Sequence, residues 1–323
     1  MGANTAECPH PSPPPPSGGG SQCVPSTDDK FFPNPPPLAG EGVRYVVPKE
    51  MLTVSNHNRA LDGFTYVYPV LSRRAGGVSV GINLNPNNAC NWQCVYCQVP
   101  DLVRGKAPKI DLTRLESELR AFLTALCRGD WLLHNAPEGA LRDIAFSGNG
   151  EPTSAVEFAD AVALVARLHA EFDLGPAVAL RLITNGSLLG QARVREGIRR
   201  LGQAGGEVWF KVDAGRMDAI ERINGVRLAP KTIARNLETC ATLCPTWVQT
   251  CVFRWDGLPP DDLEIDAWLG VLTSAAIRGV LLYGVARPSL QPAATRISPL
   301  SAEEFGRIAS KAEEKGLTVH VSP

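Results

Sequence analysis

Short runs of β-forming residues alternate with helical stretches from Gly77 onward, and this alternation constrains the fold more than any other feature. Strands and helices that alternate along one chain form parallel sheets joined by right-handed crossovers. The sequence therefore predicts an α/β fold, with six β/α units that close partly into a barrel or spread as an open sheet. In both cases functional loops gather at the carboxyl ends of the strands. The expected strands span residues 79–85, 142–147, 178–184, 207–213, 246–254 and 280–286, with a seventh run at 317–321.

Helices are expected between these strands. Helix starts are predicted where Ser or Thr is followed three residues later by Glu, because such a pair satisfies free backbone N–H groups of the first turn. Gly316 is expected to end the last helix. Capping pairs of this kind occur at Thr113 and Glu116, at Ser154 and Glu157, and at Ser301 and Glu304.

The composition divides the chain into three parts. Residues 1–45 are rich in Pro, Gly and Ser and bury too little apolar area to offset their chain entropy, so we expect a disordered leader. Residues 46–77 hold a strand-like stretch near Tyr66 and are expected to form an N-terminal extension packed on the core. Residues 78–323 are expected to form the core domain. The chain has 323 residues, 44% of them hydrophobic, which is enough for one large α/β domain.

The net charge and the cysteine content indicate which partners and which cellular compartment to expect. The formal net charge is −1, so the strongly basic footprint of a nucleic-acid-binding protein is absent. No run of eighteen apolar residues and no secretory signal occur, so we expect no membrane association and a cytoplasmic location. Nine cysteines, an odd number, are more typical of a reducing compartment than of a disulfide framework.

Three of these cysteines, Cys90, Cys94 and Cys97, lie within eight residues just past the first expected strand. Soft thiolates select zinc, copper(I) or iron–sulfur clusters. A structural zinc site has four ligands, whereas three ligands on an iron–sulfur cluster leave one iron open to bind another molecule. The alternatives are three core cysteines or a zinc site completed from a distance. The polar residues around the motif, such as Asn91 and Gln93, disfavour a buried apolar core.

The three-then-two spacing, with the aromatic Tyr96 directly before the third cysteine, resembles the radical S-adenosylmethionine (radical SAM) superfamily. The resemblance covers about residues 77–290 and implies a partial (β/α)6 TIM-like barrel. It implies that Cys90, Cys94 and Cys97 hold a [4Fe–4S] cluster whose open iron binds the methionine part of S-adenosylmethionine. Reductive cleavage of that cofactor would release a 5′-deoxyadenosyl radical, which abstracts hydrogen from a substrate. An electron donor such as flavodoxin or ferredoxin is implied as a partner.

Polar segments at the ends of three later strands extend the resemblance. Residues 147–153 read Ser-Gly-Asn-Gly-Glu-Pro-Thr and resemble the family's Gly-Gly-Glu-Pro segment, which binds the methionine amino group. Asn149 interrupts the glycine pair, and a plain turn is the alternative reading. The cofactor-binding residues that the resemblance implies are Tyr96, Gly148, Gly150, Glu151, Thr184, Asn185 and Asp213.

Strand alternation adds an expectation about the barrel interior. Trp209, Lys211 and Asp213 share one face of their strand, and Asn83 and Asn85 share a face of the first strand. If these faces point inward, the lumen is polar and suited to a substrate. Lys211 is then a candidate catalytic residue, as a substrate anchor or as an amine that reacts with a carbonyl. The alternative is an internal ion pair of Lys211 with Asp213 or Glu151.

The order of the motifs most resembles the wyosine-type tRNA-modifying branch, which needs a lysine and a second cluster. Cys240, Cys244 and Cys251 are weak candidates for that second cluster, because buried free cysteines are common in cores. The substrate stays open, with tRNA one candidate. A glycyl-radical-type activating enzyme that acts on a protein, and a non-catalytic iron–sulfur or zinc-binding module, are the alternatives.

Overall fold

The structure is a computed structural model that describes residues 63–72, 75–136, 139–285 and 287–322. The expected leader, residues 1–45, lies outside the described residues, as does the extension up to residue 62. In the described part of the extension, residues 67–72 form an edge strand of the central sheet.

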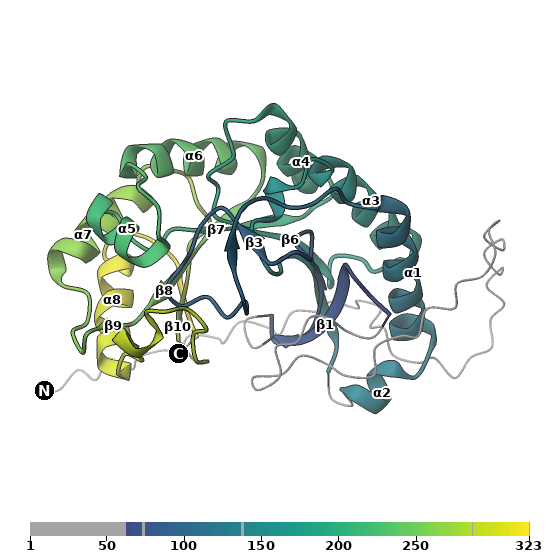
Figure 1. The fold of residues 1–323 in the computed structure, drawn as a ribbon, viewed down its shortest axis with the longest axis horizontal. Helices are drawn as coiled ribbons and strands as arrows, with labels where there is room; N and C mark the ends of the chain where they lie inside the picture. Colours follow the sequence, from purple (N-terminus) through teal and green to yellow (C-terminus); the bar gives the residue numbers. More distant parts are fainter. Residues whose placement is uncertain (1–62, 73–74, 137–138, 286, 323) are drawn as a thin grey trace, which may run out of the picture.

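Eight strands form one curled sheet, in the order β1-β2-β5-β6-β7-β8-β10-β12 (Figure 1). β1 runs antiparallel to β2, and every later neighbour is parallel. Sequential parallel neighbours form the partial (β/α) barrel that the sequence predicts. The strands are β1 (Val67–Ser72), β2 (Gly77–Ile82), β5 (Leu141–Phe146), β6 (Ala179–Thr184), β7 (Glu207–Lys211), β8 (Thr246–Val252), β10 (Val280–Gly284) and β12 (Val319–Ser322).

Helices cover the convex face of this sheet, as Figure 1 shows. The longest have amphipathic sequences whose apolar side packs on the strands, and the residues between the two layers form one hydrophobic core. Val78, Val80 and Ile82 of β2 are completely buried in it. The helices are α1 (Leu112–Arg128), α2 (Trp131–Asn135), α3 (Phe158–Glu171), α4 (Ala192–Gln203), α5 (Met217–Asn224), α6 (Pro230–Leu243), α7 (Asp262–Leu272) and α8 (Ala302–Glu313).

Two pairs of short strands lie outside the sheet. β3 (Ala89–Cys90) pairs with β4 (Val103–Arg104), and β9 (Arg254–Trp255) pairs with β11 (Ile297–Ser298). The first pair shapes the loop that carries the three cysteines.

One of the three predicted capping boxes is confirmed. Ser301 and Glu304 cap α8 reciprocally. The other two predictions are wrong. Asp111 caps α1 instead of Thr113, because its carboxylate accepts the backbone N–H of Arg114 at 3.0 Å. Ser154 lies in a short 3-10 turn, and its hydroxyl is engaged with Glu151 O and the Ala107 N–H, so α3 begins only at Phe158.

The chain segment that leads into β1 is held by a single carboxylate of α1. Glu118 is completely buried and accepts the backbone N–H groups of Thr65 and Tyr66 at 2.8 and 2.7 Å, and that of Val67 at 3.2 Å. Arg114 neutralises its charge at 2.8 Å. A buried carboxylate that is both paired and hydrogen-bonded fixes its partners strongly. The edge strand is therefore anchored to the first helix as well as to β2.

Candidate functional site

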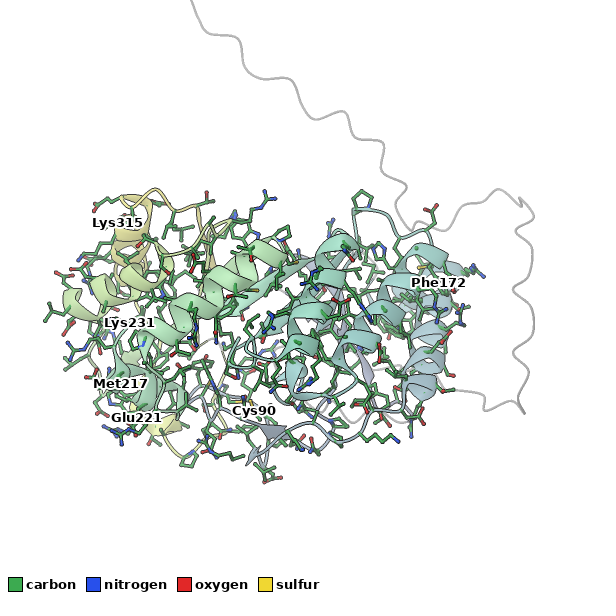
Figure 2. All side chains as sticks on the ribbon, turned by 90° about the horizontal axis from the view of Figure 1, so that it is seen from above. Cys90, Phe172, Met217, Glu221, Lys231 and Lys315 are labelled. Carbon is green, nitrogen blue, oxygen red and sulfur yellow. The ribbon has the colours of Figure 1, made fainter. Side chains whose placement is uncertain are left out.

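A cavity of about 170 Å³ lies at the carboxyl ends of the strands, beneath the cysteine loop. Figure 2 shows Cys90 on the side of the molecule opposite Lys315, which follows the C-terminal end of α8. Because helices run back against parallel strands, this is the side to which the strands point. All but two of the site residues predicted from the sequence line the cavity, namely Cys90, Cys94, Tyr96, Cys97, Gly148, Gly150, Glu151, Asn185 and Lys211.

The cysteine loop is fixed to neighbouring elements through its backbone. The Gln93 and Val95 N–H groups donate to Asn224 O and Ile223 O of α5, at 3.0 and 2.9 Å. Ser289 donates its hydroxyl proton to Val95 O at 2.6 Å. In addition, the side-chain amide of Asn224 donates to the Cys94 sulfur at 3.4 Å. These contacts fix the loop to α5 and to the segment that follows β10.

The three thiols of the loop are partly buried and free of disulfide bonds. Among the residues that the structure describes, no group of three or more His, Cys, Asp or Glu side chains is placed to hold a metal ion. Burial raises the pKa of Cys90 to about 12 and of Cys94 to about 11, and mutual repulsion adds to both. A positively charged metal group would favour the thiolates.

Glu151 joins the ends of β5 and β6. Its carboxylate accepts the Thr184 hydroxyl at 2.6 Å and the Asn185 N–H at 2.8 Å, as well as the hydroxyl and N–H of Thr153 at 2.5 and 3.1 Å. Thr184, which does not line the cavity, thus takes part in the site through Glu151. Glu151 is 3% exposed, and burial raises its pKa. Among the described residues no Lys, Arg or His forms an ion pair with Glu151, so only neutral N–H and O–H groups donate to its carboxylate.

Two glycines let the chain pass close to the cysteine loop. A Cβ at Gly150 would lie 2.0 Å from Ala89 O, and one at Gly148, where φ is +148°, would lie 2.4 Å from the Asn83 amide oxygen. Asn149 between them also lines the cavity, and its side-chain amide donates to the Asn88 side-chain oxygen at 2.7 Å. The departure from two adjacent glycines therefore falls at a position with room for a side chain.

Asp213, the second predicted residue outside the cavity lining, holds Tyr96. It accepts the Tyr96 hydroxyl, the Asn224 side-chain amide at 2.7 Å, and the Cys251 N–H at 2.9 Å. Burial and the charge of Asp213 raise the pKa of Tyr96. Sequence reasoning missed Asn224, which contacts both Asp213 and Cys94. It precedes Gly225, so its local signal is that of an ordinary helix end.

Lys211 contacts aromatic rings. Its ammonium group donates to the Tyr283 hydroxyl at 3.1 Å and lies 4.8 Å from the centre of the Tyr96 ring. It forms no ion pair with Asp213 or Glu151, so within the described residues that alternative is not realised. Burial disfavours the ammonium, but Asp213 and the ionisable groups of Tyr283, Cys94 and Cys251 together outweigh it, so the pKa of Lys211 lies above its ordinary value.

A second cavity, of about 280 Å³, continues into the barrel lumen and shares Tyr96, Cys97 and Ser147 with the first. Trp209 and Lys211 line these two cavities, as the alternation predicts. The expectation for Asn83 and Asn85 is wrong. β2 ends at Ile82, and neither side chain lines the lumen cavity. The Asn83 side chain accepts the N–H groups of Asn85 and Asn149, and the Asn85 amide donates to Ala89 O and to the Ser154 hydroxyl.

Cys240, Cys244 and Cys251 do not lie together. Cys251 lines the lumen cavity. Cys240 and Cys244 are buried in the core between the helices and the convex face, where Cys240 contacts the Thr246 hydroxyl. The sheet therefore separates Cys251 from the other two, which argues against a cluster held by all three.

Comparisons with known proteins were made on sequence and on structure. No protein-family model matches the chain. GTPase Obg of Brachyspira hyodysenteriae is 27% identical over 161 residues, which are 48% of this chain and only 20% of that protein. The sequence has no Gly-x4-Gly-Lys-Ser/Thr phosphate-binding motif.

Solved structures give longer matches. A radical SAM methyltransferase from Sphaerobacter thermophilus has a TM-score of 0.57 and 15% identity, over 81% of this chain and 70% of that one. TYW1 with a lysine-pyruvate adduct bound has a TM-score of 0.53 and 15% identity, over 79% of this chain and 85% of that one. The described chain has the fold of the radical SAM enzymes, as the sequence resemblance predicts. At this identity the likeness concerns the fold. None of the helices in the described ranges has the length and apolarity needed to cross a bilayer.

Proposed function

We propose that the chain is a radical SAM enzyme in which Cys90, Cys94 and Cys97 hold a [4Fe–4S] cluster. The observation that carries the proposal is the cavity beneath the cysteine loop. It is lined by all three thiols and by the segments that follow β5 and β6. When bound, the cluster would supply the electron that splits S-adenosylmethionine and yields a 5′-deoxyadenosyl radical for hydrogen abstraction.

The buried carboxylate of Glu151 supports a role in binding the amino group of S-adenosylmethionine. It is held by neutral donors and has no cationic partner in the described chain. An ammonium group in the cavity would therefore compensate a buried charge. Asn185 is fixed beside Glu151 through its backbone N–H, and its side-chain amide bonds Asn91 of the cysteine loop and Ser187, so it would brace the loop next to the same ligand.

Lys211 is proposed as a charged anchor for an anionic group of the bound ligand. Its contact with the Tyr96 ring and its hydrogen bond to Tyr283 favour the ammonium form. Attack on a carbonyl requires the free amine. The second role, a covalent adduct such as the one in the TYW1 structure, is favoured only by the position of Lys211 on the cavity wall.

The reductant is proposed to be a flavodoxin or ferredoxin. Modification of a tRNA is one candidate reaction, on the resemblance to the wyosine-type branch, although a net charge of −1 provides little electrostatic attraction for RNA.

Anaerobic reconstitution tests the proposal. The full chain should bind about four irons and, with dithionite and S-adenosylmethionine, form 5′-deoxyadenosine and methionine. Cys94→Ala should lose both the iron and the cleavage, while Cys127→Ala, outside the cavity in α1, should retain both. Iron binding without cofactor cleavage would identify a non-catalytic cluster protein, and cleavage that survives in Cys94→Ala would refute the cluster assignment.

A further inference from the structure

The floor of the lumen carries an ionic group that the proposed chemistry does not use. Arg181 of β6 donates to Asp143 of β5 through Nη1, and to Glu207 of β7 through Nε at 2.7 Å. Trp209 donates its indole N–H to the same Glu207 oxygen at 3.0 Å, and its ring centre lies 4.7 Å from the guanidinium carbon. One guanidinium thus faces two carboxylates, and the group carries one uncompensated negative charge.

One oxygen of this group has no partner. Asp143 is 2% exposed, and its Oδ1 forms no hydrogen bond with any described residue, while its Oδ2 binds Arg181. A buried carboxylate oxygen without a donor is costly, and most such atoms in folded proteins are satisfied. Asp143 also lines the 280 Å³ cavity. The carboxylate that carries the unpaired, buried oxygen therefore belongs to the wall of a space large enough for a ligand.

The remaining wall of the cavity is aromatic. Tyr68, Tyr96, Trp209 and Tyr283 line it from four different segments. Rings of this kind cover apolar bodies and attract cations through their faces. Two cations also line the cavities, but Lys211 is engaged with Tyr283, and Arg287 follows the end of β10, toward the cysteine end.

We infer that the lumen binds a small molecule, or a side chain, whose protonated amine donates to Asp143 Oδ1 while its apolar part packs against the aromatic wall. If the chain is the proposed enzyme, this ligand is its substrate, so the inference names the class of that substrate. Only the identification of the ligand as the substrate rests on the proposed function. Binding itself needs neither the cluster nor S-adenosylmethionine. A failure of cofactor cleavage and a failure of amine binding are therefore separate results.

The test compares benzylammonium with the neutral benzyl alcohol, using calorimetry on the full chain. The wild type should bind benzylammonium about tenfold or more tightly than the alcohol, as expected for a charge-assisted hydrogen bond. Asp143→Asn should abolish this preference. Asp160→Asn, which removes a surface carboxylate of α3 that pairs with Arg200, should leave the preference unchanged.

A second variant keeps the inference falsifiable if Asp143→Asn does not fold. Ala145→Leu fills the same cavity without touching the ion pairs and should weaken binding of both probes about tenfold or more. Equal binding of amine and alcohol by the wild type, no binding of either, or amine binding that Ala145→Leu leaves unchanged would each overturn the inference. So would a preference that persists in a folded Asp143→Asn protein.

Discussion

The ammonium nitrogen of Lys211 lies 4.8 Å from the centre of the Tyr96 ring, so a strand of the barrel wall contacts the residue directly before Cys97. This contact places a cation next to the cysteine loop. The protonation state of Lys211 therefore affects the charge at the site, and it can be tested through the reactivity of the amine.

Lys211 should react poorly with carbonyl compounds at neutral pH. The free amine of Lys211 is the form that condenses with pyruvate, with loss of water, to give an imine. Because the pKa of Lys211 is raised, this form becomes available only at alkaline pH. Borohydride trapping with pyruvate, followed by peptide mass spectrometry, should label exposed Lys231 before Lys211. Rapid, selective labelling of Lys211 at neutral pH would favour the covalent role instead.

The stability of the protein should respond to pH through Glu151. Burial raises the pKa of this carboxyl in the folded state, so the folded state holds the proton more tightly than the unfolded state does. The resulting contribution to stability is complete below the unfolded pKa and is lost as the pH rises through the folded pKa. The wild type should therefore lose stability relative to Glu151→Gln as the pH rises from about 4 to 8.

Urea unfolding of the cluster-free protein across that pH range measures the effect. Glu196→Gln is the matched control, because hydrogen bonds from Arg200 and Arg199 lower the pKa of this exposed carboxyl. Its pH slope should have the opposite sign and be small. Parallel pH profiles for wild type and Glu151→Gln would contradict the assignment.

Iron content should not depend on the cysteines of α6 and its C-cap. Cys240→Ala and Cys244→Ala are each expected to keep about four irons per chain, because the sheet separates these residues from the cysteine loop. Each should cost about 1 kcal/mol of unfolding free energy through lost packing. Iron analysis and thermal unfolding check both parts. About eight irons in the wild type that fall to about four in either variant would reinstate a second cluster.

Gly150→Ala and Asn149→Ala should differ sharply although the positions are adjacent. A Cβ at Gly150 would meet Ala89 O at 2.0 Å and displace the cysteine loop, at a cost of roughly 1–3 kcal/mol. Asn149→Ala loses the hydrogen bond to Asn88 and keeps the backbone path, for about 1 kcal/mol. Iron content after reconstitution distinguishes the two variants. Gly150→Ala should lower the iron content, and Asn149→Ala should not.

The sequence predicts the parts of this site that depend on local pattern. The cysteine spacing, the Gly-x-Gly-Glu segment and the inward alternation of Trp209 and Lys211 are all visible within a few residues. What it does not predict depends on contacts between distant segments. Asn224 binds Cys94 across 130 residues, and the unpaired oxygen of Asp143 exists only because Arg181 occupies the other one. The missed α1 cap shows that backbone geometry decides between two capping candidates only two residues apart, Asp111 and Thr113.

The anchoring of β1 by Glu118 sets an order of assembly during synthesis. The carboxylate lies 51 to 53 residues after the backbone groups that it holds. While the ribosome extends the chain, Thr65, Tyr66 and Val67 therefore emerge well before their partner exists. β1 can pair with β2 first, but the contacts that fix its entrance to the helical layer are completed only after α1 has been synthesised.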